Sequence, residues 1–118
     1  FGLICHLQEM VHRQPCGARL HAHSIPLLSG SLTLAQSSVR SSLAAANDLA
    51  LQQCTVAASL AGDPLLAILT DPQTSGGLLA AIPADTHEQC MTSLHAAGQR
   101  AWSIGLCTDN GGIIEIQE

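Results

Sequence analysis

Apolar and polar residues follow a helical period at the start of the chain. Within residues 2–13 the apolar side chains recur three or four positions apart, as they do on one stripe of an α-helix. Pro15 and Gly17 follow this stretch and act as a stop signal. The pattern therefore predicts a helix over residues 2–13, with its apolar stripe formed by Leu3, Leu7, Met10 and Val11.

The next stretch changes to a period of two. Between residues 18 and 23 small or apolar side chains alternate with basic or imidazole side chains, which is typical of a half-buried strand. We expect a short strand that ends before Pro26. One face would carry Ala18, Leu20 and Ala22, and the other Arg19, His21 and His23.

The middle of the chain has weaker patterns. Residues 27–53 are small, polar and punctuated by leucine, which favours one or two helices interrupted near the serines. Residues 54–59 fit either a buried strand or the tail of a helix. A Gly-Asp-Pro break at 62–64 then precedes an apolar run over residues 65–69.

The last third of the chain predicts a helix and two strands. Asp85 is placed as the N-cap of a helix, Glu88 completes a capping box, and Gly98 ends the helix at its C′ position. The remaining residues, 101–118, read as two strands joined in a hairpin by the turn at 109–112. The apolar face of the helix would be Cys90, Met91, Leu94 and Ala97.

Helices and strands thus alternate irregularly, which indicates an α/β (α+β) fold, a mixed-sheet sandwich with flanking helices. A length of 118 residues fits one domain, 1–118, that buries its core without staples. The core must be aliphatic, because the chain has one Phe, one Trp and no Tyr.

Composition excludes several functions. The formal net charge of −5 repels a phosphate backbone, and the near absence of aromatic side chains leaves few platforms for bases, so we expect no nucleic-acid partner. The chain has no lysine, which excludes a P-loop lysine and a Schiff-base lysine. No apolar run reaches the roughly 20 residues of a membrane span, so we expect no membrane partner and a cytoplasmic location.

Cysteine and histidine do not specify a metal site. The five cysteines are odd in number and contain no CxxC pair, so we interpret them as reduced, buried thiols. His21 and His23 share a strand face and could approach one metal with Cys16 or His12, but a solvated pair explains them without a third ligand. His6 could contact a ligand from the first turn of its helix or pack as a hydrogen-bonded histidine.

A polar turn, DPQTSGG at residues 71–77, separates two apolar runs and is the main candidate site. Two hydroxyls and two unshielded glycine N–H groups could cradle an anion there. The same residues could instead be only a tight connection between two buried strands. A strand-like run, LLAAIP, follows the turn, so no helix dipole would assist anion binding. The candidate residues are Asp71, Thr74, Ser75, Gly76 and Gly77.

The turn also carries a resemblance. DPQTSGGLL at 71–79 resembles the C-terminal-domain signature of selenophosphate synthetase, also called selenide, water dikinase. FGLICHLQEM at the start is similar to that family's GFGLLGHL helix, with Cys5 where the family usually has glycine. VRSSLAAAN resembles its RSSL segment, and GLLAAIP with AAGQRAWSIGLCTD resembles its closing strand, helix and strand. The similarity covers essentially the whole chain.

The resemblance implies a fold and a reaction. The fold would be the C-terminal domain of the superfamily that includes aminoimidazole ribonucleotide synthetase, and the N-terminal ATP-binding domain would be the partner of this chain. The family makes selenophosphate, AMP and phosphate from ATP, selenide and water with Mg²⁺. No catalytic or metal-binding residue of the family carries over to this chain, so the isolated chain is expected to be inactive and to bind no cofactor tightly.

Two other kinds of protein also fit the sequence. The chain could belong to another ATP-dependent member of the superfamily, such as thiamine monophosphate kinase, or be a non-catalytic dimerisation or regulatory module of the same fold. Family members are commonly homodimers, so a homodimer is also possible. In the leading reading, residues 71–77 face the cleft toward the N-terminal domain, where they help to enclose the phosphates or shape the selenide entrance.

Overall fold

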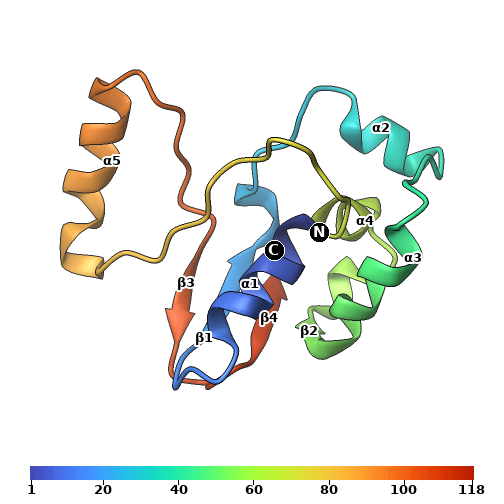
Figure 1. The fold of residues 1–118 in the computed structure, drawn as a ribbon, viewed down its shortest axis with the longest axis horizontal. Coiled ribbons are helices and arrows are strands. Elements are labelled where there is room, and N and C mark those ends of the chain that lie inside the picture. Colours follow the sequence, from blue (N-terminus) through green and yellow to red (C-terminus); the bar gives the residue numbers. More distant parts are fainter.

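A computed structural model describes all residues, 1–118, and shows a four-stranded mixed sheet with flanking helices (Figure 1). The strands follow the order β2-β4-β1-β3. The pairs β1–β4 and β2–β4 are parallel, and β1–β3 is antiparallel. The expected α+β fold class is therefore confirmed. The strands are β1 (Gly17–His21), β2 (Cys54–Val56), β3 (Gly105–Thr108) and β4 (Ile114–Gln117).

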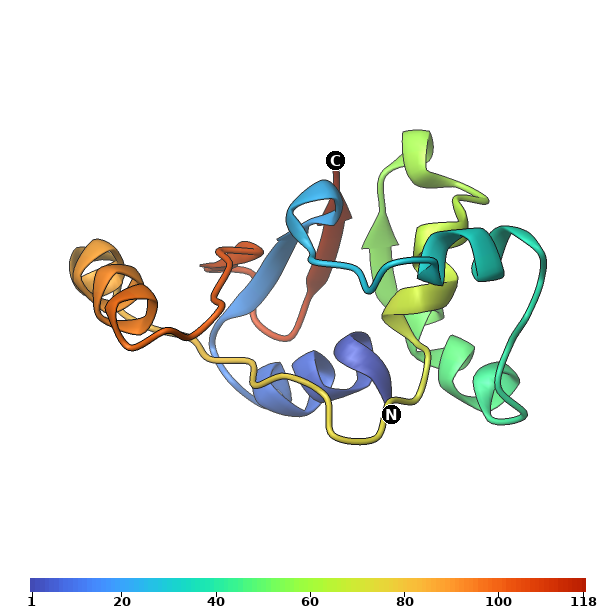
Figure 2. The same cartoon turned by 90° about the horizontal axis from the view of Figure 1, so that it is seen from above.

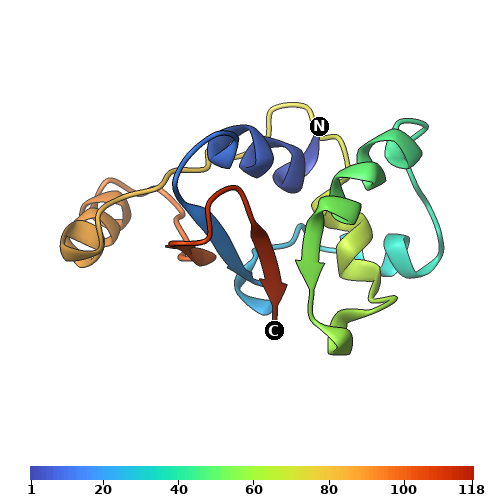
Figure 3. The ribbon, with the colours of Figure 1, turned by 90° about the horizontal axis from the view of Figure 1, so that it is seen from below.

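The helices are short, and most of them gather beyond the β2 edge of the sheet (Figure 2). Helix α1 covers one face of the sheet, whereas α5 stands apart from it in all three views (Figures 1, 2 and 3). The α-helices are α1 (Gly2–Val11), α2 (Ser31–Gln36), α3 (Ala44–Asn47), α4 (Pro64–Leu69) and α5 (His87–Ala96). The 3-10 helices are η1 (Ala22–Ser24), η2 (Asp48–Gln53), η3 (Ala58–Leu60) and η4 (Ala84–Thr86).

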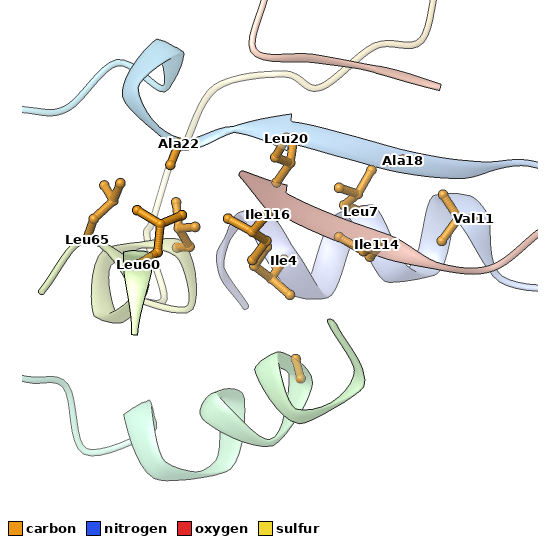
Figure 4. Close-up of a cluster of buried hydrophobic side chains, with 12 residues drawn as sticks. Ile4, Leu7, Val11, Ala18, Leu20, Ala22, Leu60, Leu65, Ile114 and Ile116 are labelled. Carbon is orange, nitrogen blue, oxygen red and sulfur yellow. The ribbon is translucent and has the colours of Figure 1, made fainter. Parts of the chain in front are cut away.

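The core lies between α1 and the sheet (Figure 4). Alternation in the strands points one set of side chains at α1, and the registers Ala18↔Ile114 and Leu20↔Ile116 stack these side chains in rows. Burial of each aliphatic side chain contributes about 1.5–3 kcal/mol. The most buried positions on these three elements are Ile4, Leu7, Val11, Ala18, Leu20, Ile114 and Ile116.

The helix and strand predicted near the start are confirmed with small changes. The apolar stripe of α1 is formed by Ile4, Leu7 and Val11, while Met10 is exposed. The expected stripe was therefore rotated, because the side chain of Ile4 was left out of it. Strand β1 buries Ala18 and Leu20 as predicted, and η1 ends it.

The expected C-terminal hairpin is wrong. Both final strands form, but they flank β1 on opposite sides and do not pair with each other. Their connection crosses the start of β1, where the Gly112 amide donates to the Cys16 carbonyl at 3.0 Å. A side chain at Gly17 would collide there, since its Cβ would lie 2.2 Å from the Asn110 carbonyl oxygen.

The expectations for residues 78–97 are confirmed only in part. The strand-like run at 78–82 forms no strand. Helix α5 forms, with Gly98 at its end in a left-handed conformation (φ +71°), as predicted. Its N-cap is Thr86 and not Asp85, because the 3-10 turn η4 occupies the predicted start. No residue of α5 is fully buried, and on its predicted apolar face Cys90 and Met91 are half-buried while Leu94 and Ala97 are exposed.

Candidate functional site

The polar turn at 71–77, which we name the signature loop, follows the end of helix α4. The Asp63 side chain caps α4 by accepting a hydrogen bond from the Leu65 amide at 2.8 Å, and Pro64 occupies the first helical position. Leu65 and Leu69 anchor the helix in the core. The signature loop therefore joins a helix to an extended segment, and the reading of it as a connection between two buried strands is wrong.

The signature loop lies on the surface. Asp71 is half-buried, whereas Thr74, Ser75, Gly76 and Gly77 are exposed. No backbone hydrogen bond of ordinary geometry involves residues 72–82. The hydroxyls and amides of the signature loop are therefore free to donate to an external acceptor, and the five predicted site residues sit together on one turn.

The turn of the signature loop does not use a left-handed glycine. The left-handed residue is Ser75 (φ 56°), whereas neither Gly76 nor Gly77 has a positive φ. A Cβ added at Gly77 would meet nothing within 4 Å. The bare backbone at these glycines thus faces open space and leaves room for a close approach from outside the chain.

A hydrogen-bonded cluster holds the base of the signature loop, and we call it the Asp48 cluster. The fully buried Thr70 donates from Oγ1 to Asp48 Oδ1 at 2.6 Å. Asn47 donates from Nδ2 to the Thr70 carbonyl oxygen at 3.0 Å. Arg40 donates from Nη2 to the same Asp48 oxygen at 2.8 Å. Thr70, which precedes the signature loop, is therefore held by Asn47 of α3 and Asp48 of η2. Arg40, from the segment before α3, holds Asp48 in turn.

Charge in the Asp48 cluster is balanced internally. The hydrogen bond from Arg40, assisted by that from Thr70, lowers the pKa of Asp48 below its usual value. The same bond raises the pKa of Arg40, and the nearby carboxylate of Asp71 adds to this rise. The Asp71 carboxylate also accepts a hydrogen bond from the Gln73 side chain. Arg40 thus pairs with Asp48 and only partly offsets the second carboxylate, that of Asp71, beside the signature loop.

The start of α1 packs against the end of α4, next to the signature loop. Gly2 (φ +81°) packs so tightly against α4 that an added Cβ would lie 2.7 Å from the Thr70 carbonyl carbon. The N-terminus and the signature loop lie side by side (Figures 2 and 3). Three segments quoted for the family resemblance, at 1–10, 39–47 and 71–79, thus meet at this end of the molecule.

Sequence reasoning missed part of this arrangement. Arg40 lies in the RSSL-like segment but was not proposed as a site residue, and neither were Asn47, Asp48 and Thr70. A sequence signal was available for one of them, because a buried threonine directly before the polar turn requires a hydrogen-bond partner. The identity of that partner is set by the tertiary fold.

An open pocket of about 440 Å³ lies beside the Asp48 cluster but does not include the signature loop. Its walls come from α2, η2 and α4, with Arg40, Asp48 and Asp63 as its charged side chains. With one arginine against two carboxylates, and the arginine already paired, the pocket has no surplus positive charge for a phosphate. The candidate anion donors therefore remain those of the signature loop.

Potential metal ligands do not form a cluster in the chain. No group of three or more His, Cys, Asp or Glu side chains is placed to hold a metal ion, so His21 and His23 find no third ligand in His12 or Cys16. His6 makes a 3.5 Å contact from Nδ1 to Glu9 Oε2 on the exposed side of α1. All five cysteines are free thiols, but none is fully buried, and Cys107 is exposed.

The comparisons with known proteins agree with the arrangement of these segments. The family described as AIR synthase related protein, C-terminal domain, matches residues 1–117. The chain belongs to this family. The expected resemblance is thereby confirmed at the level of the domain, and it extends across α1, the Asp48 cluster and the signature loop.

Relatives of this C-terminal domain carry one recurring name. The chain is 35% identical over 118 residues to the selenide, water dikinase of Carboxydothermus hydrogenoformans, covering 99% of this chain and 34% of that protein. It is 32% identical over 117 residues to the enzyme of the same name from Burkholderia orbicola, covering 98% and 33%. The corresponding protein of Porphyromonas gingivalis is 28% identical over 116 residues, covering 92% and 31%.

The chain spans about a third of the length of the curated relatives it matches. Their names describe whole proteins, whereas the match concerns this domain.

The longest helices of the structure, α1 and α5, have ten residues each, and no helix has the length and apolar character of a membrane span.

Proposed function

We propose that the chain is the C-terminal domain of a selenophosphate synthetase. In this proposal the whole enzyme converts ATP, selenide and water into selenophosphate, AMP and phosphate in the cytoplasm, with Mg²⁺ as its cofactor. The names of the relatives support this reaction over that of another ATP-dependent member of the superfamily. The isolated chain is inactive, because the chemistry belongs to an N-terminal ATP-binding domain.

The residues of this chain do not fit a magnesium site by themselves. No cluster of potential metal ligands forms, and the carboxylate of Asp48 is already engaged by Arg40 and Thr70. We therefore assign no metal-dependent step to the chain. When bound to the partner domain, magnesium would neutralise phosphate charge there.

The observation that carries the proposal is the set of free donors on the signature loop. The Thr74 and Ser75 hydroxyls and the amides of Gly76 and Gly77 are exposed and have no hydrogen-bond partner within the chain. Such donors bind phosphate oxygens or a similar anion when a second surface closes over them and excludes water. The role of this chain is to position that anion, not to react with it.

Apolar side chains beside the signature loop support a partner surface there. Phe1 is 67% exposed next to the N-terminus of α1, and Leu78 is fully exposed immediately after the loop. Exposed apolar groups at the rim of a set of polar donors are typical of a surface that another domain covers. We propose that the N-terminal domain of the same polypeptide covers them, and that the complete protein forms a homodimer.

The first test compares ATP consumption, with selenide and magnesium present, by the 118-residue chain and by the natural polypeptide that contains it. Formation of AMP and phosphate by the long form alone is the expected result. Turnover by the short chain would contradict the placement of the chemistry. If the natural polypeptide also shows no turnover, the result would favour the alternative that the chain is a non-catalytic dimerisation or regulatory module.

The second test addresses the signature loop. In the natural polypeptide, Thr74→Ala combined with Ser75→Ala should lower the rate or weaken ATP affinity. The chain offers a matched control, since the same dipeptide recurs at Thr92 and Ser93 on the exposed face of α5. Replacing both of those residues by alanine should leave activity intact. Unchanged rate and ATP affinity in the loop variant would remove the proposed role of the loop.

A further inference from the structure

An Asn-Gly pair lies in the connection between β3 and β4, outside the candidate site. Asn110 and Gly111 are both exposed, and the chain contains only one other asparagine, Asn47. The amide nitrogen of Gly111 makes no hydrogen bond within the chain. The side chain of Asn110 makes one, a 3.2 Å bond from Nδ2 to Glu115 Oε1 at the surface. An unbonded backbone nitrogen thus follows an asparagine whose side chain is held by a single long contact.

The packing around Gly111 favours the absence of a side chain there. An added Cβ would lie 3.2 Å from the Gln14 carbonyl oxygen and 3.3 Å from that of Pro15, so a larger residue fits only if the chain shifts. Because Gly111 has no side chain, nothing on that residue shields its own nitrogen. In such a pair the backbone nitrogen can approach the side-chain carbonyl carbon of the preceding asparagine with the least hindrance.

We propose that Asn110 is a site of spontaneous deamidation, in which the backbone nitrogen of Gly111 displaces the side-chain amide. The bond from that nitrogen to Asn110 Cγ forms, the Cγ–Nδ2 bond breaks, and ammonia leaves with the proton of the Gly111 nitrogen. Water then opens the succinimide ring at one of its two carbonyl groups and breaks one C–N bond. One opening gives aspartate, and the other gives isoaspartate, in which the main chain runs through the side-chain carbon.

Either product replaces a hydrogen-bond donor with a carboxylate. Glu115 on β4 accepts, through Oε2, a 2.7 Å hydrogen bond from Arg19 Nε on β1. The hydrogen bond from Arg19, with a smaller effect from that of Asn110, lowers the pKa of Glu115. A carboxylate at position 110 repels Glu115 and competes for Arg19. Deamidation therefore weakens the ion pair that joins β1 to β4.

Isoaspartate also lengthens the connection by one main-chain carbon at a tightly packed place. The Asn110 carbonyl oxygen lies so close to Gly17 that a Cβ added there would be 2.2 Å away. The same oxygen accepts a hydrogen bond from the Ile113 amide at 3.0 Å, and the Gly112 amide donates to the Cys16 carbonyl at 3.0 Å. The extra carbon displaces these bonds and loosens the crossing over β1. The inference does not depend on the proposed reaction of the whole enzyme.

The test ages the natural polypeptide that contains the chain in neutral buffer and maps its peptides over time by mass spectrometry. We expect the peptide with Asn110 to gain one dalton and to become a substrate for protein L-isoaspartyl methyltransferase. Asn47 is the matched control, since it is buried and donates to the Thr70 carbonyl oxygen. Its peptide should be unchanged when half of Asn110 has reacted. An unmodified Asn110, or equal conversion of both asparagines, would overturn the proposed site.

Two variants separate the consequences. Asn110→Asp adds the charge without changing the main chain, so it should lower the melting temperature at low salt, and added salt should restore it by screening the repulsion. Asn110→Ser cannot form the succinimide and is aged beside the unsubstituted protein, so that changes at other sites appear in both. Only the unsubstituted protein should lose stability on ageing through position 110, and this loss should persist in salt. Equal losses in the two aged proteins would show that the modification does not loosen the crossing connection.

Discussion

The hydroxyl of Thr70 donates a 2.6 Å hydrogen bond to the carboxylate of Asp48, across 22 positions of sequence. Thr70 is the last residue before the signature loop, and Asp48 opens η2. This bond fixes where α4 ends and the loop begins. Because Arg40 holds the same carboxylate oxygen, the loop is anchored to two other segments through a single side chain.

Thr70→Val should destabilise the domain by about 1–3 kcal/mol, because Val keeps the volume but removes the only hydroxyl in a fully buried position next to a carboxylate. The free energy of unfolding in urea measures the loss. Thr86→Val is the control, since the Thr86 hydroxyl bonds only the local Pro83 carbonyl on the surface. A Thr70 variant as stable as its control would show that the bond to Asp48 contributes nothing.

Stability should fall in acid partly through Asp48. Its pKa is lowered in the folded state below the ordinary value of 3.8, chiefly by Arg40, so its contribution is complete above about pH 5 and is lost as the pH falls through the folded pKa. Asp48→Asn removes this titration. The stability difference between the two proteins should therefore shrink between pH 5 and pH 2 in urea or thermal unfolding. A constant difference over that range would contradict the assignment.

Local patterns predicted the elements whose signals lie within one turn or one strand. The period of α1, the alternation of β1 and the left-handed Gly98 were all readable, since each depends on near neighbours in sequence. The apolar run at 65–69 was not resolved by its pattern, because five apolar residues in succession fit a buried helix as well as a strand. Pro64 after Asp63 was the missed signal of a helix start.

Strand partners and the Asp48 cluster could not be predicted in the same way. The turn at 109–112 has hairpin composition, but the pairing of β3 and β4 with β1 is decided by contacts almost a hundred residues apart. Likewise, nothing near Thr70 in sequence identifies Asp48 or Asn47 as its partner. The location of the signature loop was predictable from its motif, whereas the residues that hold it required the fold.

Gly17→Ala tests the unexpected strand order. The added Cβ would lie 2.2 Å from the Asn110 carbonyl oxygen and 2.3 Å from that of Ile113, both rigid backbone atoms in the crossing connection. We expect a loss of about 3 kcal/mol in the free energy of unfolding, at the upper end of the range for overpacking. In a simple hairpin no connection would cross β1, and the substitution would be nearly neutral.

Gly77→Ala tests whether the signature loop receives something from outside the chain. No atom lies within 4 Å of the added Cβ, and the residue does not have a positive φ, so stability should change by no more than about 0.5 kcal/mol. The activity of the natural polypeptide should nevertheless fall, because a methyl group would occupy the space through which a phosphate or the partner domain approaches the loop amides. Urea unfolding and the rate of AMP formation are measured on the same preparation. Gly17→Ala serves as the opposite control, since its defect should appear first in stability. If Gly77→Ala preserves both stability and rate, the open face of the signature loop is not approached during the reaction, and its free donors have no part in positioning the anion.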